Sequence, residues 1–222
     1  MIKKVLYFLV LVIIFSFLLL PFYIKVKIEC KAQTGPCPSE INTKLRELNS
    51  KSLFKARRSV SAIVKSSFLV SDFSTQFKLP NVLSINIIIK KPKFAILNKS
   101  TNKYNLIDGS GIILSLSDNS NLPTIVKEDV GQKPGDIISE EDLFSLKLIE
   151  GLYQMYQISI GTIQNDTLVV DLPSGIRVIF PLRDSDRDIL LGALRLIYAK
   201  VTTESEVKYS QIDMRYKNPV LR

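Results

Sequence analysis

The sequence predicts an α+β fold: an N-terminal transmembrane helix, a small domain of strand, helix, helix, strand and strand, and a mainly antiparallel β domain with two helices. An uncharged apolar run predicts the membrane helix. In the small domain, apolar residues first recur every second position, then at helical spacing, and then every second position again, which predicts strand, helices and strands. In the β domain, alternating apolar residues are interrupted by two stretches of helical spacing. We place the three parts at residues 1–24, 25–91 and 92–222.

The apolar run extends from Val5 to Ile24 without a charged side chain. About 20 helical residues cover roughly 30 Å, the thickness of the hydrocarbon layer of a membrane. A cleaved signal peptide has a shorter apolar region, about 7–15 residues, that ends in small residues, and a lipoprotein signal is disfavoured because Glu29 precedes Cys30. We therefore expect a retained single-pass anchor in the plasma membrane, with a short cytoplasmic N-terminus and the remaining chain outside the cytoplasm.

Positive charge is concentrated in the small domain. Residues 40–93 contain eleven lysines and arginines against three acids, whereas residues 94–222 contain fourteen against seventeen. Part of this charge is carried by Lys51, Lys55, Arg57 and Arg58, but no groove-reading motif or pattern of stacking aromatic residues accompanies them, so we expect no nucleic-acid partner. Contact with anionic lipid or with an acidic partner is one interpretation, and a solvated helix face is the other.

Two cysteines, Cys30 and Cys37, closely follow the predicted membrane span. In an extracytoplasmic domain such a pair predicts a disulfide. Closing so short a loop contributes about 2–3 kcal/mol of stability in the chain-entropy model. A zinc site needs more ligands than these, and the chain contains no histidine, so we expect neither a metal nor a cofactor.

Apolar spacing predicts five elements in the small domain. Residues 24–29 alternate apolar and charged side chains, as a half-buried strand does. Two helices follow: the first begins with Ser39 as its cap, and the second follows residues 50–52. Residues 68–90 return to a period of two, which predicts two antiparallel strands joined by a reversal at residues 79–82.

Turn and capping signals divide the β domain. Pro92 marks its beginning, because proline ends a central strand. The Asp-Gly turn at residues 108–109 predicts one hairpin, and residues 167–180 contain a second. Ser139 and Ser185 each begin a Ser-x-x-acid box before an apolar run, so each is expected to cap a helix.

The order strand, helix, helix, strand, strand matches that of a POTRA domain, an α+β module used for protein contacts at membranes. Residues 79–87, together with residues 90–92, resemble the end of this domain in the FtsQ/DivIB family of bacterial cell-division proteins. Residues 104–111 look like the family's first hairpin after the POTRA domain. Residues 212–216, within a candidate last strand that starts at Gln211, look like its closing strand. The succession of these motifs behind one membrane span carries the resemblance.

The resemblance implies a scaffold of the divisome at the division septum. FtsQ-like proteins organise septal cell-wall synthesis by binding the small bitopic coiled-coil proteins FtsB and FtsL, and the family's last strand pairs edge to edge with FtsB. The matching positions here are Arg215, Tyr216, Asn218 and Val220. An exposed strand edge offers unpaired amide and carbonyl groups to such a partner. The alternative is that these residues only close the sheet, with Tyr216 as a core aromatic.

Two short motifs resemble those of penicillin-recognising enzymes. Ser52 and Lys55 form a Ser-x-x-Lys, and residues 117–119 read Ser-Asp-Asn, but the third motif, Lys-Thr-Gly or Lys-Ser-Gly, is missing. We therefore expect no enzyme activity, no catalytic residue and no small-molecule substrate. A Ser-Lys wall hydrolase or transpeptidase stays as one alternative function, and a membrane-anchored POTRA adaptor of a secretion or envelope-assembly system as another.

Three aspartates at every second position have the spacing of the first three ligands in a calcium-binding loop. Such a loop needs glycine at its sixth position and glutamate at its twelfth, where this chain has Ile189 and Arg195. Helix capping accounts for the three acids, and we expect no metal at Asp184, Asp186 and Asp188.

Overall fold

The computed structural model describes residues 21–128, 131, 133–183, 185–204 and 209–222. The predicted cytoplasmic N-terminus and membrane helix lie outside these residues, apart from the last four residues of that helix. Within the described chain, no helix is long and apolar enough to cross a membrane. Two compact units divide between Lys90 and Lys91. Each is an α+β structure built on a mixed sheet.

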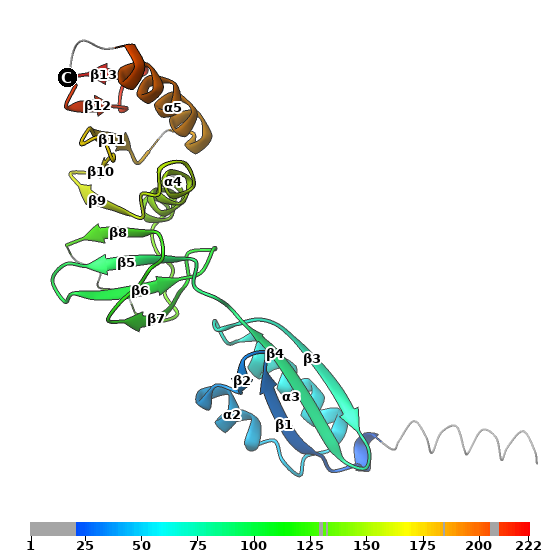
Figure 1. Cartoon of the computed structure of the whole chain (residues 1–222). Coiled ribbons are helices and arrows are strands. Elements are labelled where there is room, and N and C mark those ends of the chain that lie inside the picture. The colour runs from blue at the N-terminus through cyan, green and yellow to red at the C-terminus, as the bar shows by residue number, and fades with distance from the viewer. Residues whose placement is uncertain (1–20, 129–130, 132, 184, 205–208) are drawn as a thin grey trace, which may run out of the picture. The chain divides into compact units, whose positions relative to one another are not determined.

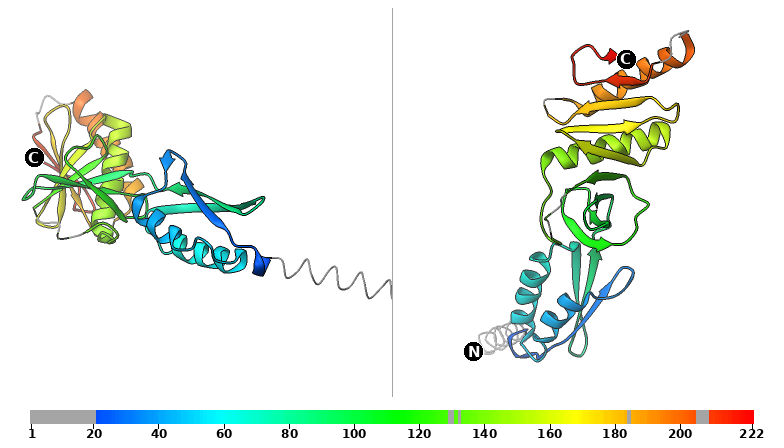
Figure 2. Two further views of the ribbon diagram at one scale, coloured as in Figure 1. Left: turned by 90° about the horizontal axis from the view of Figure 1, so that it is seen from below. Right: turned by 90° about the vertical axis from the view of Figure 1, so that its left-hand side faces the viewer.

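The first unit has a four-stranded sheet with two helices on one face (Figures 1 and 2). The strand order is β2-β1-β4-β3, in which β1 and β4 are parallel and the other two pairs are antiparallel. Its elements are β1 (Lys27–Ala32), β2 (Gly35–Pro36), α2 (Ser39–Arg46), α3 (Leu53–Lys65), β3 (Val70–Lys78) and β4 (Val82–Ile89).

The predicted order of strand, helix, helix, strand and strand is confirmed in the first unit, with the short β2 as an addition. The first strand was expected at residues 24–29 but begins at Lys27. Residues 24–26 bond instead to the segment that leads into α3: the amide of Leu53 donates to the carbonyl of Ile24 at 2.8 Å, and that of Val26 to the carbonyl of Lys51 at 3.1 Å.

The core of the first unit lies between α2, α3 and one face of β4. β4 contributes alternate residues, which is why its period of two predicted a strand. The prediction that Ser39 caps α2 is wrong, because Pro38 occupies the cap position and Ser39 is the first helical residue. The buried residues that these elements share are Ile41, Leu45, Ala56, Val60, Val64, Leu83, Ile85 and Ile87.

The second unit is a nine-stranded sheet with order β13-β12-β11-β10-β9-β8-β5-β6-β7 in the described residues (Figure 1). Helices α4 and α5 pack on one face of this sheet, as both views in Figure 2 show. Its elements are β5 (Phe94–Asn98), β6 (Lys103–Ile107), β7 (Ile113–Ser117), β8 (Thr124–Lys127), α4 (Glu140–Tyr156), β9 (Ile160–Gln164), β10 (Thr167–Asp171), β11 (Arg177–Pro181), α5 (Arg187–Glu204), β12 (Gln211–Asp213) and β13 (Val220–Leu221).

The expectation of a mainly antiparallel sheet is corrected to a mixed sheet. Three neighbouring pairs are parallel: β5 with β8, β8 with β9, and β11 with β12. Two of these pairs are joined by a helix, β8 to β9 through α4 and β11 to β12 through α5. Each helix carries the chain back to the end of the sheet at which the preceding strand began, so the next strand runs parallel to that strand. The two predicted hairpins are confirmed as β6–β7 and β10–β11.

The helices of the second unit are tightly joined to each other and to the sheet. A Cβ atom on Gly151 in α4 would overlap the end of the Leu191 side chain in α5, so any larger residue would force this side chain to move. Further along, the rings of Tyr156 and Tyr198 meet edge to face with centroids 5.3 Å apart. The core beneath both helices includes Ile149, Leu152, Leu168, Val178, Phe180 and Leu194.

The two predicted helix starts differ in outcome. Ser139 caps α4 as expected, because its hydroxyl accepts a hydrogen bond from the Asp142 amide at 3.1 Å. At α5 the predicted cap, Ser185, is replaced by Asp186, whose carboxylate accepts from the amides of Asp188 at 2.8 Å and Ile189 at 3.1 Å. The capping role predicted for this acidic segment therefore falls on Asp186. Asp184 lies outside the described residues.

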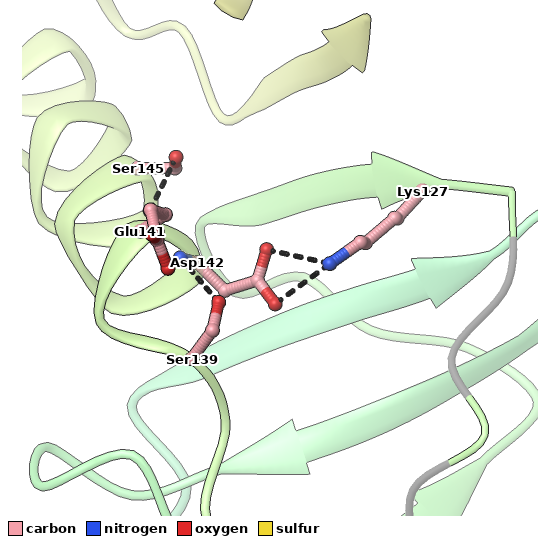
Figure 3. Close-up of polar contacts among 5 residues, drawn as sticks. All are labelled: Lys127, Ser139, Glu141, Asp142 and Ser145. Carbon is pink, nitrogen blue, oxygen red and sulfur yellow. Dashed lines mark hydrogen bonds and ion pairs between the residues drawn. The ribbon is translucent and has the colours of Figure 1, made fainter. Parts of the chain in front are cut away.

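A salt bridge fixes the start of α4 to the sheet (Figure 3). The ammonium group of Lys127, at the end of β8, donates to both carboxylate oxygens of Asp142 at 3.1 and 3.0 Å. The Asp142 side chain is only 5% exposed and that of Lys127 is 38% exposed. Nearby hydroxyls serve the helix backbone: Ser145 donates to the Glu141 carbonyl at 2.7 Å.

Candidate partner-binding edge

The end of the chain forms one edge of the large sheet. The predicted last strand, residues 211–216, is β12 only over its first three residues. After Met214 the chain loops outward and returns as β13, which pairs antiparallel with β12 and covers it. The expected closing strand is therefore not the edge. Among the described residues, β13 is the outermost strand at this end.

The hydrogen-bond register shows which backbone groups of β13 face outward. Gln211 and Arg222 exchange both backbone hydrogen bonds, each at 3.0 Å. Hydrogen-bonding direction alternates along an antiparallel strand. The amide and carbonyl of Leu221 therefore point away from β12, whereas its side chain packs against the core. This residue supplies a donor and an acceptor on the open side of the sheet.

Asp213 anchors the loop between the two strands. It is fully buried at the end of β12 and binds Arg215, whose Nε donates to Oδ1 at 2.8 Å and whose Nη2 donates to Oδ2 at 2.6 Å. Side-chain hydrogen bonds from this guanidinium are the main reason why the pKa of Asp213 is lowered from its ordinary value. The same contact raises the pKa of Arg215. The buried carboxylate thus holds Arg215 in one position.

The four predicted partner-binding residues all reach solvent. The Arg215 side chain is 41% exposed even though it is paired, and the Tyr216 ring, 53% exposed, lies beside its guanidinium at 5.9 Å. The alternative that Tyr216 is a core aromatic is wrong. Asn218 is exposed in the loop, and Val220 lies opposite Asp213 in the β12–β13 register. The fold therefore brings Arg215, Tyr216 and Val220 to one edge with Asn218 between them in the chain.

An apolar row continues from this edge across the sheet face that carries no helix. The strand registers place one residue of each strand in line with Asp213 and Val220. These side chains are partly buried and do not belong to the core under the helices. We call them the open-face row: Ile179, Val169, Thr162, Val126 and Leu97.

Sequence reasoning missed the open-face row. A signal for it exists, because β10 and β11 contain three consecutive apolar residues each, 168–170 and 178–180. A strand with one solvated face alternates apolar and polar residues, whereas a strand apolar on both faces does not. The uninterrupted runs show that these two strands carry apolar side chains on both faces.

The Ser-x-x-Lys and Ser-Asp-Asn motifs belong to different units. Ser52 and Lys55 lie at the start of α3 in the first unit, whereas residues 117–119 begin at the last residue of β7 in the second. The Ser117 hydroxyl donates to the Asn119 carbonyl at 2.7 Å. Lys127, which has two serines nearby, donates to Asp142 and not to a serine hydroxyl (Figure 3). Within the described residues, no group of three or more His, Cys, Asp or Glu side chains is placed to hold a metal ion.

Cys30 and Cys37 form a disulfide in the first unit. The bond closes the small β1–β2 hairpin, in which Lys31 pairs with Pro36. Cys37 is buried, and both cysteines pack against the core of this unit. Such bonds persist in oxidising compartments, so the disulfide is a hint of an extracytoplasmic domain.

No family model and no curated protein matches the sequence.

Proposed function

We propose that this chain is a bitopic membrane scaffold of the bacterial cell-division machinery, similar to FtsQ/DivIB, with a POTRA domain at residues 25–91 and a β domain at residues 92–222. It acts at the septum of the plasma membrane and organises cell-wall synthesis by binding FtsB/FtsL-like coiled-coil proteins. The strand order of the first unit and its disulfide support this assignment. One observation carries it: the open edge of β13 lies beside exposed Arg215, Tyr216 and Val220.

The partner adds a strand to this edge. The outward amide and carbonyl of Leu221 give the new strand two backbone hydrogen bonds, and the side chains beside it select the sequence that binds. The edge itself is short, and Lys217 and Pro219 precede it. Both residue types protect natural sheet edges from unspecific pairing. Affinity must therefore come from the side chains around the edge as well as from its backbone.

The sharpest test separates the outward amide of Leu221 from its side chain. Leu221→Pro removes the amide donor on the open side, a change that edge strands tolerate, and Leu221→Ala is the matched control that removes the side chain but keeps the donor. The full-length protein is crosslinked in native membranes and its partners are identified by mass spectrometry. We expect Leu221→Pro to capture a small bitopic coiled-coil protein roughly tenfold less well than Leu221→Ala, the effect of one hydrogen bond.

Three outcomes contradict the proposal in different ways. Equal capture by the two variants moves the partner away from the β13 edge. Capture of envelope-export components by both variants supports the adaptor function instead. Labelling of Ser52 by a β-lactam probe assigns the protein to the Ser-Lys enzymes.

A further inference from the structure

A basic hollow lies beside the end of the predicted membrane span. Its volume is about 910 Å3, and three cations and three aromatic rings line it together with two serines. This basic hollow is defined by its cations and rings: Lys51, Lys55, Arg58, Phe22, Tyr23 and Phe54. It belongs entirely to the first unit.

Backbone contacts join the chain that leaves the span to the start of α3. Lys25 and Ser52 form an antiparallel bridge, and the Leu53 amide donates to the Ile24 carbonyl at 2.8 Å. The rings of Phe22 and Phe54 stack with centroids 4.8 Å apart. These contacts hold the two sides of the hollow, residues 22–25 and the start of α3, against each other where the predicted span ends.

The electrostatic potential of the hollow is positive. Lys51, Lys55 and Arg58 are all exposed, and none of them forms an ion pair with another residue that the structure describes. Among the described residues that line the hollow there is no acid. The first turn of α3 also contains no acid, so nothing there offsets the positive end of the helix. An anion is the complementary ligand.

The aromatic rings identify the source of this anion as a lipid. Tyr23 is 77% exposed and Phe22 is 50% exposed, and both belong to the last residues of the apolar run. Aromatic rings at such positions lie among lipid headgroups, and basic residues just outside a span attract anionic lipids. An acidic protein would match the charge but would leave these rings unexplained.

We propose that the basic hollow binds the phosphodiester headgroup of an anionic phospholipid such as phosphatidylglycerol. Lys51, Lys55 and Arg58 contact the phosphate, and Phe22 and Tyr23 rest against the glycerol and upper acyl region. This inference depends on the membrane anchor and not on the division role. It gives the first unit a fixed attachment to the membrane surface, in addition to its covalent link to the span.

The test uses the full-length protein in nonionic detergent. Short-chain phosphatidylglycerol, phosphatidylcholine with the same acyl chains, and inorganic phosphate are each titrated, and bound lipid is counted by native mass spectrometry. The hollow variant carries Lys51→Gln, Lys55→Gln and Arg58→Gln. The control variant loses equal charge at three exposed cations outside the hollow, with Lys44→Gln, Arg46→Gln and Lys65→Gln.

We expect saturable binding of phosphatidylglycerol that phosphatidylcholine does not reproduce. Each cation near an anionic surface contributes about a fivefold change in affinity, so the hollow variant should bind about a hundredfold more weakly while the control variant stays near wild type.

Equal loss in both variants overturns the site, because net charge alone then explains binding. Equal binding of the two lipids, or competition by inorganic phosphate at the same concentration as the lipid, overturns the assignment to a phospholipid. Crosslinking of Lys55 to an acidic protein without lipid binding favours that partner instead.

Discussion

At the scale of single residues, buried carboxylates hold the second unit in place at two points. Asp213 binds Arg215 at the candidate edge, and Asp142 binds Lys127 below α4. Each acid is almost fully removed from water, while each cation keeps partial contact with it. A buried charge is costly unless it is paired, so removal of either cation leaves an unfavourable carboxylate behind.

Asp213 makes a pH-dependent contribution to stability. Its pKa is lower in the folded protein than the unfolded value of about 3.9, so the contribution is complete above that value and is lost as the pH falls through the folded pKa. Asp213→Asn should therefore lower the free energy of unfolding near neutral pH, and the difference from wild type should shrink on acidification below about pH 4. Urea unfolding between pH 2 and pH 8 measures it. A difference that does not vary with pH would contradict this role.

The salt bridge between Lys127 and Asp142 predicts a clear loss of stability. Lys127→Met keeps the length of the side chain but removes the charge, which should lower the free energy of unfolding by about 2 kcal/mol. Lys99 is a suitable control, because its contact with Glu128 is long, at 4.0 Å, and both side chains are exposed. Lys99→Met should change stability by less than about 0.5 kcal/mol. Chemical denaturation of both variants compares them directly.

At the scale of elements, side-chain packing decides how closely α4 and α5 approach each other. Gly151 allows α4 to approach α5, whereas Gly192, also within a helix, has no atom within 4 Å of the Cβ position. Glycine within a helix lowers stability relative to alanine, so it is expected where a neighbouring side chain occupies the position of a Cβ atom. Close packing therefore accounts for Gly151 but not for Gly192.

Alanine substitutions at these two glycines should have opposite signs. Gly151→Ala forces the Leu191 side chain to move in a packed core and should destabilise the second unit by about 1–2 kcal/mol. Gly192→Ala enters open space and should stabilise the helix by about 0.5–1 kcal/mol. Thermal unfolding followed by circular dichroism distinguishes the two. The same sign for both substitutions would refute the close approach of the helices.

The disulfide contributes to the first unit through the hairpin that it closes. With a sequence separation of 7, the chain-entropy model predicts a contribution of about 2 kcal/mol. Cys30→Ala with Cys37→Ala should lower the stability of the first unit by this amount and leave the second unit unchanged. The wild-type protein isolated without reductant should have no thiol that reacts under denaturing conditions. Titration of two thiols would show that the bond is absent in the cell.

At the scale of the whole molecule, each unit has its own hydrophobic core. The clusters that contain Leu45 and Phe180 share no residue, and the chain divides between Lys90 and Lys91. A unit with its own core and sheet has what independent folding requires. The division of charge follows the same boundary, because the basic residues concentrate before it.

Residues 91–222 should therefore fold in isolation. We expect this fragment, expressed without the first unit, to unfold cooperatively and at the same denaturant midpoint as the second unit within residues 25–222. Circular dichroism and tyrosine fluorescence provide the measurement. A fragment without a cooperative transition would mean that the second unit depends on the first.

The sequence by itself determined the helices and most of the strands, because their signals are local. The apolar spacing of α3 and the Ser139 cap of α4 involve residues within a few positions of each other. The apolar run that predicts the membrane span and the two cysteines are local signals of the same kind. At α5 a local signal was ambiguous, since Ser185 and Asp186 are both capping residues and only the backbone geometry selects Asp186.

Only the tertiary structure decided the pairing of strands, and with it the candidate site. Nothing near Val220 in the sequence indicates that it pairs with Asp213, or that β13 takes the edge that residues 211–216 were expected to form. The parallel pairs around α4 and α5 and the salt bridge from Lys127 to Asp142 also join residues distant in sequence. Strand register depends on which face is buried and on which backbone groups find partners, and both are properties of the assembled sheet.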